Sequence, residues 1–125
     1  MKIAHIGFTV SDIQKTKEMY TKALTPLGLS VQMEGEGYVG FGSDGSNLLW
    51  LGKISDKHSI IAKDIHVAFL AKKQEDVDAF YKAGLEAGFT DNGAPGIREH
   101  YAPNYYAAFL LDKDGNNIEV VYFVP

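Results

Sequence analysis

Residues 110–124, LLDKDGNNIEVVYFV, decide the fold: a tight turn leads into a strand that is apolar after Asn117 except for Glu119. Val, Ile, Tyr and Phe are typical of strands that are at least half buried. Burying a carboxylate without a partner is costly, so carboxylates inside a core are paired, protonated or bound to a metal. Glu119 is therefore expected to meet a partner from elsewhere in the chain.

Length and composition restrict what that partner can be. The 125 residues, 46% of them hydrophobic, are expected to form one domain with its own core. The chain has no cysteine, which excludes disulfides and thiolate metal sites. Any metal would be held by His, Asp or Glu.

The charge pattern indicates which class of ligand to expect. Twelve Lys and Arg and 16 Asp and Glu are scattered without runs, so the sequence predicts no nucleic-acid or anionic-membrane surface. The first residues, MKIAHIGFTVSD, resemble neither a signal peptide nor a membrane span. We expect a cytoplasmic protein that binds a small molecule.

The first half of the chain predicts a strand, a helix and three further strands. The helix is expected to begin at Ser11, with Gln14 completing a capping box, and to end at Gly28. The predicted strands are residues 2–10, 29–36, 38–42 and 47–51.

The second half predicts the same order of elements, so the single domain 1–125 divides into modules 1–53 and 63–125. A strand at 64–71 precedes a helix at 75–85, and strands follow around Phe89, at 105–111 and at 117–124. Residues 92–104, NGAPGIREHYAPN, show no regular period and are expected to be irregular.

Aligning the two halves pairs specific residues. AHIGFTV from Ala4 aligns with IHVAFLA from Ile65, which sets His5 against His66. DGSNLLWL from Asp44 aligns with DGNNIEVV from Asp114, which sets Leu49 against Glu119.

If the modules pack about a pseudo-twofold axis, His5, His66 and Glu119 are expected to meet. Two imidazoles and a carboxylate form a three-ligand site for a divalent metal, with coordination positions left open. Period two places Gly7 and Ala68 on the same faces as the two histidines, which leaves room for a ligand.

The motifs HIGFTVSDI, IHVAF and YYAAFLLDKDGNNIEVV resemble those of the vicinal oxygen chelate superfamily, also called the glyoxalase, bleomycin resistance and dioxygenase superfamily. The resemblance covers the whole chain. It implies an α+β fold of two βαβββ modules that form a curved, mostly antiparallel sheet around a metal pocket. It also implies one divalent ion, Fe, Mn, Ni or Zn, on His5, His66 and Glu119, and a homodimer.

One position departs from the pattern of lactoylglutathione lyases, which carry a fourth glutamate ligand on the last strand of the first module. That place falls on Leu49, or on Trp50 if the register slips by one, and residues 45–53 contain no Asp, Glu or His. The remaining triad resembles that of extradiol dioxygenases.

The resemblance therefore leaves two enzyme types open, a lyase or isomerase and a dioxygenase. Either would act on a small substrate that chelates the metal through adjacent oxygens. The alternative is a non-enzymatic binding protein similar to the bleomycin resistance proteins.

The irregular segment and its surroundings supply the remaining candidates. Arg98 is expected to bind a carboxylate or phosphate of the substrate. Tyr101 and Tyr105, together with Glu119, are the predicted proton-transfer groups. His100, Tyr106 and Trp50 are the further predicted substrate contacts. The alternative for the aromatic residues is to cap a sheet edge or form a dimer contact.

Overall fold

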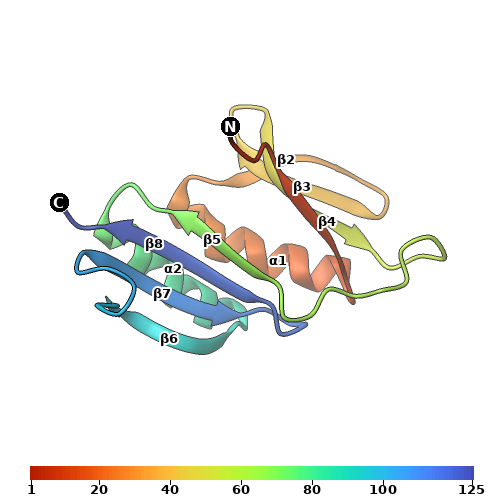
Figure 1. Ribbon diagram of the computed structural model, residues 1–125. Coiled ribbons are helices and arrows are strands. Elements are labelled where there is room, and N and C mark those ends of the chain that lie inside the picture. Colours follow the sequence, from red (N-terminus) through yellow and green to blue (C-terminus); the bar gives the residue numbers. More distant parts are fainter.

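The computed structural model describes all residues, 1–125, and its elements repeat the order βαβββ (Figure 1). This confirms the predicted fold class. No helix is both long and apolar enough to cross a membrane. The elements are β1 (Ile6–Val10), α1 (Ile13–Leu24), the 3-10 helix η1 (Thr25–Leu27), β2 (Ser30–Gly35), β3 (Tyr38–Ser43), β4 (Ser46–Lys53), β5 (His66–Leu70), α2 (Gln74–Ala87), β6 (Thr90–Ile97), β7 (Tyr105–Leu111) and β8 (Asn117–Phe123).

The strands form two four-stranded sheets with matching topology, β1-β4-β3-β2 and β5-β8-β7-β6. In each sheet the first strand runs parallel to the last strand of its module, and the other pairs are antiparallel. The sheets are not joined by strand pairing, so the expected curved surface consists of two halves that stay open. The edge strands are β1 and β2 in one sheet and β5 and β6 in the other, and one backbone hydrogen bond on the outer edge of β1 runs from Ala62 N to Thr9 O at 2.9 Å.

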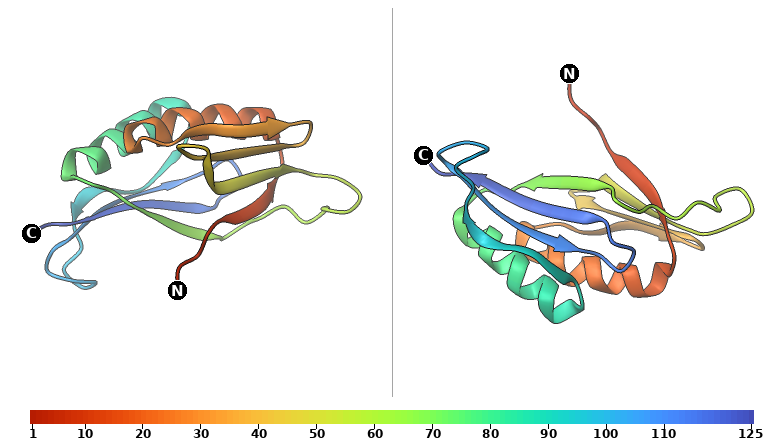
Figure 2. Two further views of the ribbon diagram at one scale, coloured as in Figure 1. Left: turned by 90° about the horizontal axis from the view of Figure 1, so that it is seen from above. Right: turned by 60° about the horizontal axis from the view of Figure 1, so that its bottom comes forward.

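The two helices pack against each other on one side of the sheets, with α2 against β6, β7 and β8 and α1 against β2 and β4 (Figure 2). Side chains from both modules meet there in one apolar cluster, in which Tyr20, Phe41, Phe80 and Leu110 are fully buried. The helix side of the sheets is therefore the core side, and a ligand site must lie on the other side.

The start of the chain differs from the sequence prediction at two points. The first strand begins only at Ile6, so His5 lies just outside it. The N-cap of α1 is Asp12, whose Oδ1 accepts a hydrogen bond from Lys15 N at 3.0 Å, so the predicted cap at Ser11 is wrong. The backbone amide of Ser11 instead donates to Asp114 Oδ2 at 3.0 Å. Asp caps a helix as well as Ser does, and its backbone here is extended.

Part of the segment predicted to be irregular is a strand. Residues 92–97 belong to β6, and only 98–104 form the turn that leads to β7. The pairing of β6 with β7 shifts register between Asp91 and Gly93 and again between Gly93 and Gly96. These bulges break the period of two, which is why the sequence pattern did not reveal the strand.

The turn before β8 is a buried polar cluster. Asp112 is 5% exposed, and its Oδ2 accepts hydrogen bonds from the hydroxyl of Tyr20 on α1 at 2.6 Å and from Asn116 Nδ2 at 3.1 Å. The side chain of Asn116 also donates to Ala62 O at 3.0 Å and accepts from Ile65 N at 3.1 Å. The cluster thereby ties the start of β8 to α1 and to the connection between the modules, which fixes where the last strand lies.

Candidate functional site

Glu119 finds its partners on the two strands that flank β8. Its carboxylate is buried, at 2% exposure, and Oε1 lies 2.7 Å from Nε2 of His66 on β5. Its other oxygen, Oε2, accepts a short hydrogen bond from the hydroxyl of Tyr105 on β7. Both carboxylate oxygens are satisfied, which accounts for a charged residue in this apolar strand.

The sheet register brings these groups together. Ala68 of β5 is paired with Glu119, and His66 lies two residues earlier on the same strand face. The side chain of His66 is 53% exposed, whereas that of Glu119 is 3% exposed. The residue of β5 directly beside Glu119, Ala68, has only a methyl side chain, so the pair is reached from the open side of the sheet.

The 2.7 Å contact between His66 and Glu119 requires one proton, held on either the imidazole or the carboxylate. Burial, the hydrogen bond to Glu119 and the charge of Glu119 raise the pKa of Tyr105, in that order of importance. Tyr105 therefore remains a hydrogen-bond donor at neutral pH and orients the carboxylate.

His5 does not join this pair. It lines a cavity of about 280 Å³ together with His66, and the walls of that cavity are otherwise apolar. No three or more His, Asp or Glu side chains in the chain lie close enough to hold one metal ion. Of the three predicted metal ligands, a single chain brings together His66 and Glu119 and leaves His5 apart.

Three of the other predicted residues do lie beside His66. Arg98, His100 and Tyr101 line a second cavity, of about 320 Å³, on the module 2 side of the pair. The ring of Tyr101 packs between those of His100 and Tyr105, tilted to the first and edge-on to the second, at centroid distances of 4.2 and 5.1 Å.

The sequence reasoning missed four residues of this second cavity, Asn92, Gly93, Phe109 and Asn117. Asn117 lies two residues before Glu119 in the same strand, so the period of two was a signal that could have found it. Phe109 is paired with Glu119 across β7 and β8, which only the register reveals.

Two predicted substrate contacts lie elsewhere. The hydroxyl of Tyr106 donates to Asp78 Oδ1 at 2.5 Å on α2, so this side chain points to the helix side of the sheet. Trp50 lines a separate hollow on module 1 with Gly7 and Tyr38, and His66 is not part of that hollow. The structure brings neither Tyr106 nor Trp50 to the His66–Glu119 pair.

The predicted equivalence of Leu49 with Glu119 is wrong. Trp50 is paired with Gly7, as Glu119 is paired with Ala68, so Trp50 holds the equivalent position. Leu49 is 1% exposed and packs in the core. The position in module 1 that is equivalent to Glu119 is therefore occupied by an indole.

A bulge causes this shift of one residue. In the pairing of β3 with β4, Phe41 is opposite Leu49 and Gly42 is opposite Asn47, which leaves Leu48 without a partner. The matching pair, β7 and β8, is regular throughout. Counting residues from the turn therefore gives the wrong register in module 1.

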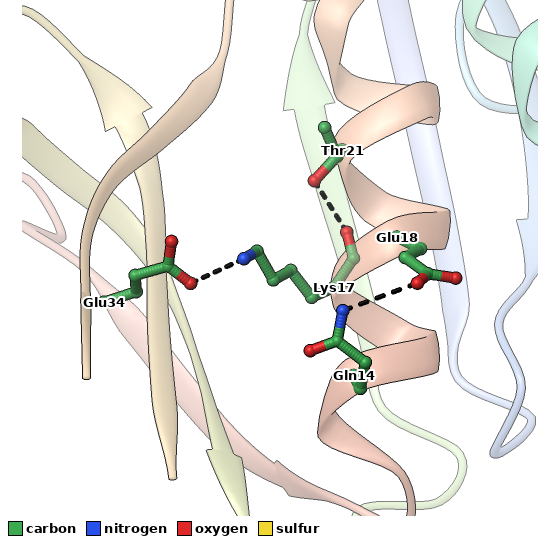
Figure 3. Close-up of polar contacts among 5 residues, drawn as sticks. All are labelled: Gln14, Lys17, Glu18, Thr21 and Glu34. Atoms are coloured by element: carbon green, nitrogen blue, oxygen red, sulfur yellow. Dashed lines mark hydrogen bonds and ion pairs between the residues drawn. The ribbon is translucent and has the colours of Figure 1, made fainter. Parts of the chain in front are cut away.

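The second ion pair of the chain lies away from both cavities. Lys17 Nζ of α1 contacts Glu34 Oε2 of β2 at 2.6 Å, and Gln14 Nε2 donates to Glu18 on the same helix (Figure 3). These side chains face solvent, where such pairs contribute little to stability.

A profile of the Glyoxalase/Bleomycin resistance protein/Dioxygenase superfamily matches residues 2–120. Among solved structures, a glyoxalase/bleomycin resistance protein from Albidiferax ferrireducens T118 superposes with a TM-score of 0.82 at 25% identity, over 96% of this chain and 98% of that one. A glyoxalase-related enzyme from Fulvimarina pelagi superposes with a TM-score of 0.76 at 12% identity, over 98% and 88% of the two chains.

A glyoxalase/bleomycin resistance protein/dioxygenase family enzyme from Burkholderia phytofirmans PsJN superposes with a TM-score of 0.74 at 16% identity, over 99% of this chain and 100% of that one. The structures from Fulvimarina and Burkholderia share the fold alone with this chain. A search of curated proteins found no match.

Proposed function

Because the chain belongs to the Glyoxalase/Bleomycin resistance protein/Dioxygenase superfamily, we propose that it is a divalent-metal-dependent enzyme acting on a small substrate with adjacent oxygens. The observation that carries this proposal is the 2.7 Å contact between His66 Nε2 and Glu119 Oε1 at the open face of the second sheet. Imidazole nitrogen and carboxylate oxygen are the donors that Fe, Mn, Ni and Zn accept. Neighbouring ligand atoms around such an ion lie about 3 Å apart, so the pair needs little movement to hold one.

The third ligand in this proposal is His5. It occupies the position in module 1 that His66 occupies in module 2, and both line the same cavity. We propose that a homodimer completes the site, with His5 of one copy approaching His66 and Glu119 of the other. Exposed apolar side chains next to the edge strand β1 and on the edge strand β5 support this arrangement, since Ile3 is 77% and Leu70 is 71% exposed.

The residues of the pair have distinct tasks in this proposal. A bound ion would supply Lewis-acid polarisation of the substrate oxygens. To bind an ion through Nε2, the imidazole of His66 would carry its single proton on Nδ1, and the ion would replace the hydrogen bond to Glu119. Tyr105 holds the Glu119 carboxylate in place through its hydrogen bond.

Tyr101 and His100 stand at the rim, where a substrate oxygen would exchange a proton. Proton transfer of this kind suits a lyase or isomerase, and the two-histidine, one-carboxylate donor set suits a dioxygenase. Both reaction types belong to the proposal, as does the cytoplasmic location.

Elemental mass spectrometry of anaerobically purified protein tests the proposal. We expect about one Fe, Mn, Ni or Zn per chain, with the metal lost in His66→Ala, Glu119→Ala and His5→Ala. Tyr106→Phe, which alters the helix side of the same sheet, is the matched control and should keep its metal. Absence of metal after reconstitution with each ion, or loss in Tyr106→Phe as well, contradicts the proposal.

A second candidate function is non-enzymatic sequestration of a small molecule. The observation that favours it is that Glu119 is fully satisfied by His66 and Tyr105 within one chain. The cavity of about 280 Å³ would then hold an apolar ligand. Saturable binding of a hydrophobic dye to chelator-treated protein, undiminished in Glu119→Gln and weakened in Phe69→Ala on the cavity wall, would support this function over the first.

A further inference from the structure

The second cavity contains the chain's sole arginine. We call this cavity the polar pocket, and its lining residues are His66, Asn92, Gly93, Arg98, His100, Tyr101, Phe109 and Asn117. Among these, Arg98 alone carries a charge at every accessible pH. The lining residues come from β5, β6, β7, β8 and the turn after β6.

The guanidinium of Arg98 is held in one orientation. Nη1 donates to Gly96 O at 2.9 Å and Nη2 donates to Ala94 O at 2.6 Å. The group also lies over the ring of Phe109, with Cζ 5.2 Å from the ring centroid. A guanidinium has five N–H groups, so three remain free after these two hydrogen bonds.

The bulged strand β6 leaves space for this side chain. A Cβ at Gly93 would lie 3.1 Å from Arg98 Nη2, and a Cβ at Gly96 would lie 3.2 Å from Nη1. Gly93 also has a φ of +149°, which a residue with a side chain rarely adopts. The lack of side chains at the two glycines therefore leaves space for the guanidinium against the backbone of β6.

No carboxylate neutralises this charge. The two ion pairs of the chain are Lys17 with Glu34 and His66 with Glu119, so Arg98 takes part in neither. Its sequence neighbour Glu99 is exposed and forms no ion pair. A half-buried guanidinium with free donors and no counter-ion is suited to binding an anion.

A second donor group lies in the same pocket. Asn117 Oδ1 accepts a hydrogen bond from Asn92 Nδ2 at 3.2 Å, which leaves the two amide N–H groups of Asn117 unused. His66 also lines the pocket and reaches Glu119 at 2.7 Å, so a molecule there can touch both the guanidinium side and the reactive pair.

We propose that the polar pocket binds the oxyanion of a substrate, with Arg98 and the amide of Asn117 as donors to it. The substrate class is then a small carboxylic acid or phosphate ester, whose remaining oxygens reach His66 and Glu119. The inference rests on the proposed function for the reacting end of the molecule. The oxyanion subsite itself consists of protein donors alone and needs no metal.

Nuclear magnetic resonance of chelator-treated protein tests the subsite. Because Arg98 is the only arginine, its Nε–Hε signal needs no assignment, and inorganic phosphate and acetate can be titrated separately at constant ionic strength. We expect saturable shifts of this signal and of the Asn117 side-chain amide with at least one of the two anions. Saturation with phosphate alone identifies a phosphate substrate, and saturation with acetate alone identifies a carboxylate.

Two variants separate the subsite from general charge attraction. Arg98→Gln should weaken binding at least about tenfold, as expected when a charge-assisted donor is lost. Lys113→Gln removes the same charge at an exposed site and should bind like the wild type. The inference is overturned if neither anion saturates, if both variants weaken equally, or if only surface lysine signals shift.

The subsite and the proposed metal function can fail independently. Anion binding that depends on Arg98 in a protein that takes up no metal supports the subsite and contradicts the metal proposal. Metal uptake that depends on Glu119, without anion binding, supports the metal proposal and contradicts the subsite. If the backbone amide spectrum of Arg98→Gln outside the pocket matches that of the wild type, misfolding is excluded as the cause of lost binding. The same comparison is made for a second variant, Arg98→Lys.

Discussion

Trp50 and Glu119 hold equivalent positions in the two modules, since each is paired with the small residue of its module's first strand, Gly7 or Ala68. One open sheet face therefore presents an indole where the other presents a buried carboxylate. The hollow around Trp50 includes Tyr38 and three glycines, whereas the pocket beside Glu119 includes arginine, histidine and asparagine. The two modules thus share a backbone arrangement but carry different side chains at equivalent positions.

Gly40 makes room for the indole of Trp50. A Cβ at Gly40 would lie 2.8 Å from Trp50 Cζ3 and even closer to the side chain of Asn47. We expect Gly40→Ala to lower the free energy of unfolding by about 1–3 kcal/mol, as overpacking does. Urea denaturation measures it.

Gly52→Ala is the matched control, because its nearest atoms lie 4.0 Å from the added Cβ. Its effect should stay within about 1 kcal/mol. Equal losses in Gly40→Ala and Gly52→Ala would show that neither Trp50 nor Asn47 restricts Gly40.

Glu119 is a cause of the raised pKa of Tyr105, after burial. Replacing Glu119 with Gln removes the negative charge while burial remains, so the pKa of Tyr105 should fall but stay above its ordinary value. Carbon-13 NMR of labelled tyrosine across an alkaline titration measures it.

Asp78→Asn is the companion experiment, because burial and Asp78 raise the pKa of Tyr106. That variant should lower the pKa of Tyr106 and leave Tyr105 unchanged. A Tyr105 pKa that does not move in Glu119→Gln would mean that burial acts alone.

Tyr20 links stability to alkaline pH. Burial first, and then the charge of Asp112, raise its pKa in the folded state. Above about pH 10 the unfolded chain loses this proton while the folded chain keeps it. The free energy of unfolding should therefore fall as pH rises, by up to about 1.4 kcal/mol per pH unit from this one group.

Tyr20→Phe should remove that contribution to the slope. It should also cost about 1–3 kcal/mol at neutral pH, because Asp112 loses a hydrogen bond while buried. Tyr122→Phe, a half-buried tyrosine in β8, is the control and should keep the wild-type slope. Urea unfolding between pH 7 and pH 11 distinguishes them; identical slopes in both variants contradict the assignment.

Leu70 tests the proposed homodimer. It lies on the edge strand β5, on the same face as His66, and is 71% exposed. Leu70→Lys should shift sedimentation from dimer to monomer and lower the metal content of the purified protein. Ile60→Lys places the same charge at a residue 85% exposed in the connection between modules and should leave both quantities unchanged. A dimer that survives in Leu70→Lys excludes this edge as the interface.

The βαβββ order could be read from the chain because it depends on short-range periods. The meeting of His66 with Glu119 was predicted together with His5, from the alignment of the two halves. Helical spacing and the glycines at 28 and 88 located the helices, which end close to where they were expected. Alternation along 64–71 placed His66 and Ala68 on one face before any register was known. Local backbone geometry dictates these periods.

Bulges and long-range contacts could not be predicted from these short-range periods. The extra residue Leu48 moved Trp50 into the place assigned to Leu49, and two shifts near Gly93 concealed half of β6. The separation of His5 from His66 and Glu119 depends on how two unjoined sheets pack through their helices.

The sequence by itself determined the elements, their faces and the need of Glu119 for partners, since these follow from side-chain type and a period of two or 3.6 residues. Only the tertiary structure decided that Tyr105 is one of those partners, that Arg98 lies over Phe109 beside His66, and that His5 stands apart. The physical reason is that register and module packing are set by the whole core, where a single unpaired residue reverses which side chains share a face.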